Sequence, residues 1–183
     1  LIPKFGLVSP MRNLWLDAME FLEEFYFVVD DRSFNLNFEI VSKLKHLKYC
    51  YISNYSPSKK FLKIVDACPK LSKLTFLGKM DDEILKLLAS KSNKSNALKE
   101  LKLVPSIGFS IDAVEHFFKH ATFVDDSDID LKINATLSEV EQMMKRIDKY
   151  KVSLFEQEGQ LVEMMLKKID EQICITVWIL LKL

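Results

Sequence analysis

The chain has 183 residues, of which 49% are hydrophobic and 28% charged, so it suits one folded domain or one compact repeat array. Abundant hydrophobic residues exclude intrinsic disorder, and four glycines and five prolines are too few for a sandwich or barrel of tight hairpins. The net charge is zero, but residues 43–102 hold fourteen basic and five acidic side chains between two acidic ends. This basic band is a solvated lysine-rich face or a docking patch for an acidic partner.

Three segments of the form L-x-x-apolar-x-apolar begin at Leu44, Leu71 and Leu98, at steps of 27 residues. Weaker copies begin at Leu22 and Asp126, followed by Val152–Leu154 and the apolar stretch 173–181. Such self-similarity predicts a repeat architecture. We therefore expect residues 1–183 to form a single array of about seven strand–helix units, clearest over residues 44–124.

The stretches between these segments have apolar residues at helical period, at 61–68, 84–88, 114–118, 140–147 and 161–169. The acids at 81–83 suit a helix start, and Ser110 is a candidate N-cap. Ser138 followed by Glu141 has the form of a capping box. Gly159 precedes the last expected helix. The predicted order is therefore strand, helix, strand, helix throughout.

Alternating strands and helices imply parallel strands joined by right-handed crossovers. The expected strands alternate, as in Leu101-Lys102-Leu103, which leaves one face of the sheet wet. A doubly wound sheet would need continuously apolar strands. The pattern thus favours an α/β fold in the form of a right-handed βα solenoid, with a parallel concave sheet and outer helices.

The segments at Leu44–Tyr49, Leu71–Phe76 and Leu98–Leu103 match the L-x-x-L-x-L core of leucine-rich repeats. The unit length and the helices resemble the ribonuclease-inhibitor-like and F-box-associated classes, and Cys68-Pro69-Lys70-Leu71 resembles a helix-end phrase of the F-box group. In that group, the resemblance implies, such arrays are substrate-recognition arms of ubiquitin-ligase adaptors. The sequence departs from the family in lacking a regular Asn or Cys after each strand, and no F-box is recognisable.

In such an arc, the residues between the buried leucines face the concave side. We expect a partner protein, which the basic band suggests could be acidic, to bind on two neighbouring columns of this face. The predicted binding residues are Tyr26, Lys48, Thr75, Lys102 and Asp130 in one column, and Val28, Cys50, Leu77, Val104, Lys132 and Phe155 in the other. The second column is largely apolar, as hot-spot strips are.

No catalytic constellation is evident, and we expect neither an enzyme nor a cofactor. His116 and His120 share a helix face but lack further ligands for zinc, and Asp125 to Asp130 lack the glycine and distal glutamate of a calcium loop. With three arginines and no recognised module, nucleic acid is not an expected partner, nor is a small-molecule substrate. The alternatives left open are a scaffold without a ligase link and an α/β enzyme with a cleft at the strand ends.

The cysteines Cys50, Cys68 and Cys174 are odd in number and irregularly spaced, so they predict reduced thiols rather than disulfides. The sequence starts without a signal-peptide pattern, which favours a cytoplasmic or nuclear protein. The apolar stretch 173–181 is too short for a membrane helix, and a membrane partner is not expected. As a terminal strand it would leave an uncapped edge, so we expect either a missing downstream cap or a pairing partner. Because the chain also begins with Leu1, we expect it to be a fragment.

Overall fold

The computed structural model describes residues 9–69 and 72–182. Within these ranges the chain forms six helices and eight strands. The helices are α1 (Ser9–Met19), α2 (Phe34–Val41), α3 (Ser58–Ala67), α4 (Glu83–Lys91), α5 (Ile111–His120) and α6 (Leu137–Arg146). The strands are β1 (Glu24–Val29), β2 (Tyr49–Asn54), β3 (Lys73–Gly78), β4 (Leu98–Pro105), β5 (Phe123–Lys132), β6 (Tyr150–Glu158), β7 (Leu161–Lys168) and β8 (Cys174–Leu180).

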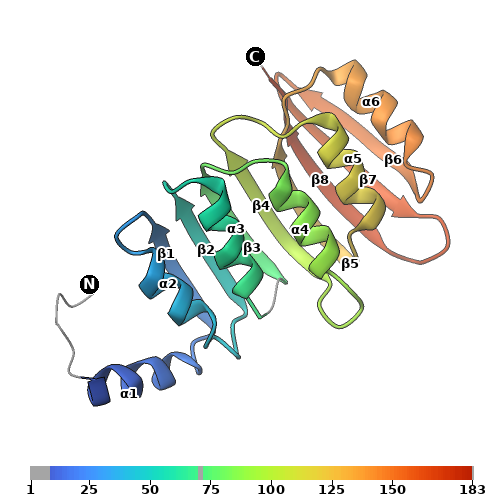
Figure 1. Ribbon diagram of the computed structural model, residues 1–183. Coiled ribbons are helices and arrows are strands. Elements are labelled where there is room, and N and C mark those ends of the chain that lie inside the picture. Colours follow the sequence, from blue (N-terminus) through green and yellow to red (C-terminus); the bar gives the residue numbers. More distant parts are fainter. Residues whose placement is uncertain (1–8, 70–71, 183) are drawn as a thin grey trace.

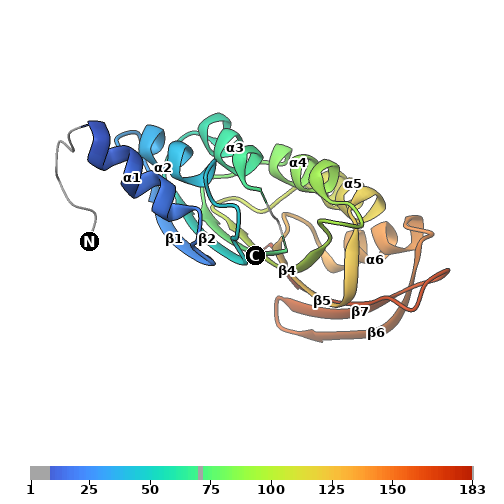
Figure 2. The same cartoon turned by 90° about the horizontal axis from the view of Figure 1, so that it is seen from below.

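All of these strands belong to one sheet, in the order β1-β2-β3-β4-β5-β8-β7-β6 (Figure 1). Strands β1 to β5 pair in parallel, β8 is parallel to β5, and β7 is antiparallel to both of its neighbours. The predicted α/β class is therefore confirmed, whereas the sheet, predicted to be parallel, is mostly parallel with antiparallel pairing at β7. Figure 2 shows the helices on one side of this sheet.

Burial alternates along the strands, as a sheet covered on one face requires. In β8 the side chains of Ile175, Val177 and Ile179 are fully buried, whereas those of Thr176 and Trp178 between them are half-buried. One continuous hydrophobic core runs from α1 to the last strand, between the helices and this face of the sheet. The opposite face carries the alternate residues, and we call it the open face.

The strand–helix alternation has the predicted form, but the length of the unit is not constant. In β2, Cys50 rather than Leu47 pairs with Leu74, so this unit is 24 residues long. Leu74 in turn pairs with Leu101, 27 residues further on, as predicted. The register predicted for β2 is therefore wrong by three residues.

The error in β2 has a clear cause. Leu44 and Leu47 are both buried, but they lie in the turn that leads into the strand. The three-residue spacing of Leu44 and Leu47, which precede β2, equals that of Leu98 and Leu101, which lie within β4. The spacing of leucines alone therefore does not show where a strand begins. Leu71, the start of the next predicted copy, lies outside the described residues.

The helix starts agree with the sequence in part. Ser110 caps α5, since its hydroxyl accepts a hydrogen bond from the backbone N–H of Ala113. The capping box of α6, however, consists of Thr136 and Glu139, so the predicted pair of Ser138 and Glu141 is two residues too late. In the observed pair, as in the predicted one, the two residues are three positions apart.

The C-terminal third departs from the predicted order. Residues 161–168 form β7, so the helix expected there is wrong. Val162, Met164 and Leu166 are buried and alternate with more exposed residues, which is the period of a strand. Gly159, with φ at +61°, lies at the turn between β6 and β7. In place of about seven strand–helix units, the described chain has five, followed by three consecutive strands.

The last strand is not an edge. After α6 the chain places β6 at the outside of the sheet, and β7 and β8 then return toward β5. Strand β8 pairs with β5 on one side and with β7 on the other. The apolar stretch that seemed uncapped in the sequence is thus paired within the chain, and β1 and β6 are the edges of the described sheet.

Candidate functional site

The open face is a two-dimensional array of side chains whose rows cross the strands. The middle row holds Tyr26, Tyr51, Thr75, Lys102, Asp130, Trp178 and Glu163. On one side lies a more apolar row with Val28, Ser53, Leu77 and Val104, continued by Lys132, Leu180 and Leu161. On the other side lie Glu24, Tyr49, Lys73, Glu100, Asp128, Thr176 and Met165. Among the described residues, no helix or strand covers these rows.

Most of the predicted binding residues lie together in these rows. Tyr26, Val28, Thr75, Leu77, Lys102, Val104, Asp130 and Lys132 all belong to the open face. Side chains alternate between the two faces along each strand, and this alternation was enough to predict that these residues lie on the uncovered face.

Three predicted residues lie elsewhere. Lys48 precedes β2 and pairs with Glu23, with 2.7 Å between its amine and the carboxylate. Cys50 is fully buried in the core, where a hydrogen bond with Cys68 and burial raise the pKa of its thiol well above the usual range. Phe155 follows an irregularity in the β6–β7 pairing and pairs with the buried Met164, so it faces the helix side.

Two residues that the sequence pattern missed are prominent on the open face. Tyr51 takes the place predicted for Lys48, because the register of β2 is shifted. Trp178 lies beside Asp130, because β8 inserts next to β5. The alternation of buried and less buried residues within β2 could have placed Tyr51 on the open face. No local sequence pattern indicates that Trp178 lies beside Asp130.

Three tyrosines form a cluster at the β1 end. The ring of Tyr26 lies 5.5 Å from that of Tyr49 and 5.9 Å from that of Tyr51, measured between centroids. The Tyr49 hydroxyl is 3.0 Å from that of Thr75. Tyr26 is 60% exposed, and its hydroxyl donates to Glu24 over 3.3 Å. Exposed amphipathic rings held by their neighbours are typical of binding hot spots.

A shallow hollow of about 390 Å³ occupies the centre of the open face. Its walls include Tyr49, Thr75, Glu100, Lys102, Asp128, Asp130 and Trp178. Lys73 pairs with Glu100 and Lys102 with Asp130, which leaves the charge of Asp128 uncompensated by an ion pair among the described residues. Desolvation and the nearby Asp130 raise the pKa of Asp128, although a hydrogen bond with Trp178 opposes them.

The basic band is largely compensated in space. Several of its lysines pair with acids about one unit away in the chain: Lys45 with Glu20, Lys48 with Glu23, Lys60 with Asp31 and Lys91 with Asp66. Such exposed pairs contribute little stability, but they reduce the positive field of the band. The preference for an acidic partner stays a prediction.

The histidines form no metal site. The rings of His116 and His120 stack with 4.1 Å between centroids, and burial and the charge of His120 lower the pKa of His116. In residues 9–69 and 72–182, no group of three metal-ligating side chains occurs. The four aspartates from Asp125 to Asp130 all lie within β5, and Asp125 accepts a hydrogen bond from the backbone N–H of Cys174 over 2.8 Å.

Comparison with known proteins gives no relative: no family model, no curated protein and no solved structure matches the chain. Within the described part of the chain, no helix has the length and apolar character needed to cross a bilayer. The function is therefore inferred from the side chains of the open face.

Proposed function

We propose that the chain is a leucine-rich-repeat-like βα solenoid that binds a protein partner on the open face of its sheet. One observation carries this proposal, namely the group of exposed and half-buried aromatic and apolar side chains that begins with Tyr26, Tyr49 and Tyr51. A sheet face with such residues and no covering layer in the described chain has the composition of a protein interface.

Two further features support a repeat array. Consecutive strands from β1 to β5 pair in chain order, each followed by a helix on the same side. Polar contacts also link neighbouring units, as where Asn54 donates to the carbonyl of Lys79 and Asp82 accepts from Ser110. This nearest-neighbour stacking is the physical basis of solenoids.

The binding test compares tyrosines of the same kind in different places. We expect the double substitution Tyr26→Ala with Tyr51→Ala to reduce capture of a specific partner from source-cell extract at least tenfold, since tyrosines dominate interface hot spots. Tyr55→Ala is the matched control, because Tyr55 is 65% exposed but lies beyond the end of β2. Quantitative mass spectrometry of the captured proteins is the measurement. A partner that both variants retain equally would overturn binding on the open face.

The narrower role is that of a substrate-recognition arm of an F-box type ubiquitin-ligase adaptor. It rests on the resemblance of the Leu44–Tyr49, Leu71–Phe76 and Leu98–Leu103 segments, and we propose it as one use of the same face. Affinity purification of the product of the complete gene would test it, with cullin and adaptor subunits as the expected companions. Their absence, while a partner on the open face persists, would favour a scaffold without a ligase link.

A further inference from the structure

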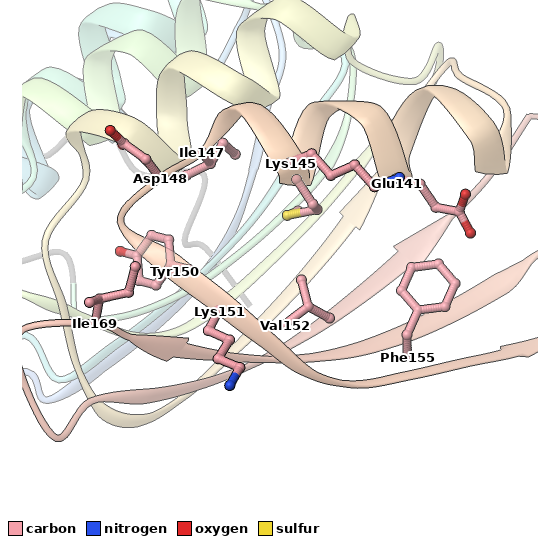
Figure 3. Close-up of a pocket in the computed structure, with 10 residues that line it drawn as sticks. Glu141, Lys145, Ile147, Asp148, Tyr150, Lys151, Val152, Phe155 and Ile169 are labelled. Atoms are coloured by element: carbon pink, nitrogen blue, oxygen red, sulfur yellow. The ribbon is translucent and has the colours of Figure 1, made fainter.

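A second surface of the molecule lies at the opposite end of the sheet from the tyrosine cluster. Between α6 and β6 the chain leaves a groove of about 760 Å³ (Figure 3). Its floor and walls are mainly apolar, formed by Met144, Ile147, Tyr150, Val152, Phe155 and Ile169. Ile169 is 63% exposed, so the groove leaves apolar surface uncovered.

The strand beside the groove is an edge. Within the described chain, β6 pairs only with β7, so the backbone groups along its other side have no strand partner. An edge strand next to uncovered apolar surface is a template for pairing with another chain.

The sequence of β6 is complementary to itself in one antiparallel register. If the two copies are centred between Ser153 and Leu154, Lys151 lies opposite Glu156 of the second copy, and Val152 lies opposite Phe155. Opposite charges directly across an antiparallel pair stabilise it.

The irregularity in β6 makes this register geometrically consistent. Residues opposite each other across a twofold axis must share a sheet face, and in a regular strand residues of odd separation do not. The register shift between Val152 and Leu154 changes the alternation by one residue. Val152 and Phe155, which pair with the buried Leu166 and Met164, therefore share the helix side, and Lys151 and Glu156 share the open side.

The helix above the strand also presents both charges to the groove. Glu141 and Lys145 are exposed on α6 and line the groove. Figure 3 shows both side chains on the α6 side of the groove, with Glu141 above Phe155 and Lys145 extending along the helix toward Glu141. A second copy at this edge would therefore meet both an acidic and a basic group on each helix.

We propose that the groove is the self-association surface of this protein, and that a second copy occupies it by antiparallel pairing of β6 with β6. The interface is isologous, with the sheet continuing across the twofold axis and the apolar residues of the two grooves facing each other. It does not depend on the open face, so the tyrosine cluster remains available in the dimer.

Charge reversal tests the register directly. Analytical ultracentrifugation of the 183-residue chain over a wide concentration range is expected to show a monomer–dimer equilibrium. Lys151→Glu places glutamates opposite each other at two symmetric positions and is expected to weaken dimerisation roughly tenfold. Glu156→Lys is expected to act likewise, and the double variant with both changes restores the attraction and the dimer.

Controls separate the proposal from general effects of charge. Lys63→Glu changes the same charge on an exposed lysine of α3, far from β6 in the sheet order, and should leave the equilibrium unchanged. Circular dichroism verifies that each variant is folded. A chain that stays monomeric at every concentration would overturn the proposal. So would a dimer that neither single reversal weakens, or that the double variant fails to restore.

Discussion

At the scale of single residues, the stacking of neighbouring units depends on close backbone approach. Gly78 has φ at +101°, and a Cβ there would lie 2.3 Å from the carbonyl oxygen of Asn54. Gly159 also has positive φ, at +61°, but a Cβ there would meet nothing within 4 Å. We expect Gly78→Ala to lower the free energy of unfolding by about 3 kcal/mol and Gly159→Ala by about 1 kcal/mol. Urea unfolding followed by circular dichroism measures both, and equal losses would contradict the role of the contact.

Asn54 fixes the same place with its side chain. It is fully buried, and its amide donates to the carbonyls of Ser56, over 3.0 Å, and Lys79, while its Oδ1 accepts from the Ser56 N–H over 3.1 Å. Asn54→Ala leaves these backbone groups unpaired, so we expect a loss of about 2 kcal/mol in the free energy of unfolding. The exposed Asn35 on α2 is the control, with an expected change under about 0.5 kcal/mol on substitution by alanine. Similar losses in the two variants, measured by denaturation, would refute this role of Asn54.

At the scale of elements, the start of α6 shows which of two possible residue pairs forms the capping box, Thr136 with Glu139 or Ser138 with Glu141. The Thr136 hydroxyl accepts from the N–H of Glu139, and the Glu139 carboxylate accepts from the N–H of Thr136 over 2.7 Å. The hydrogen bonds that the Thr136 N–H and the Thr136 hydroxyl donate to this carboxylate lower the pKa of Glu139. We expect Thr136→Ala to lower the free energy of unfolding by about 1 kcal/mol, whereas Ser138→Ala, within the helix, has little effect. Thermal melting of the two variants checks the assignment, which the reverse order of effects would disprove.

The packing of α5 on α6 should depend on pH through Glu115. Its carboxylate accepts hydrogen bonds from Arg146 and Lys119, and these partners lower its pKa. A lowered pKa means that the stabilisation is complete above the ordinary pKa of 4.5 and is lost as the pH falls through the folded-state value.

We therefore expect Glu115→Gln to lower the free energy of unfolding by about 1 kcal/mol at neutral pH, since the carboxylate is only 15% exposed. The difference from the unsubstituted chain should shrink as the pH falls below 4.5. Asp170→Asn is the control, because Asp170 is exposed in the turn between β7 and β8 and has no ion pair among the described residues. A difference that is independent of pH would show that the carboxylate charge is not the cause.

The elements also show where sequence patterns suffice. Helix α5 was predictable because Val114, Phe117 and Phe118 have helical spacing behind a capping serine. Residues 161–169 were not, because their apolar positions fit a helical stripe as well as a strand, and the choice depends on pairing with β6 and β8. Secondary structure that tertiary pairing decides cannot be read from local periodicity.

At the scale of the whole molecule, the open face was predictable in its middle and not at its ends. Thr75, Lys102 and Asp130 follow one another because β3, β4 and β5 keep chain order. The neighbour of Asp130 is Trp178, 48 residues on, because β8 rather than β6 pairs with β5. That insertion is a property of topology, which no repeat length encodes.

The inserted position of β8 leads to the last prediction. Chain termini normally exchange their amide hydrogens rapidly, yet β8 lies between β5 and β7 with Ile175, Val177 and Ile179 fully buried. We expect the amides of β8 to be among the slowest to exchange with deuterium, and those of the edge strand β1 to exchange faster. Hydrogen–deuterium exchange resolved by mass spectrometry or NMR is the measurement. Because dimerisation through β6 would protect that strand as well, the comparison uses β1, whose outer side the proposed dimer leaves free. Exchange in β8 as rapid as in β1 would show that the last strand frays and that the sheet effectively ends at β5.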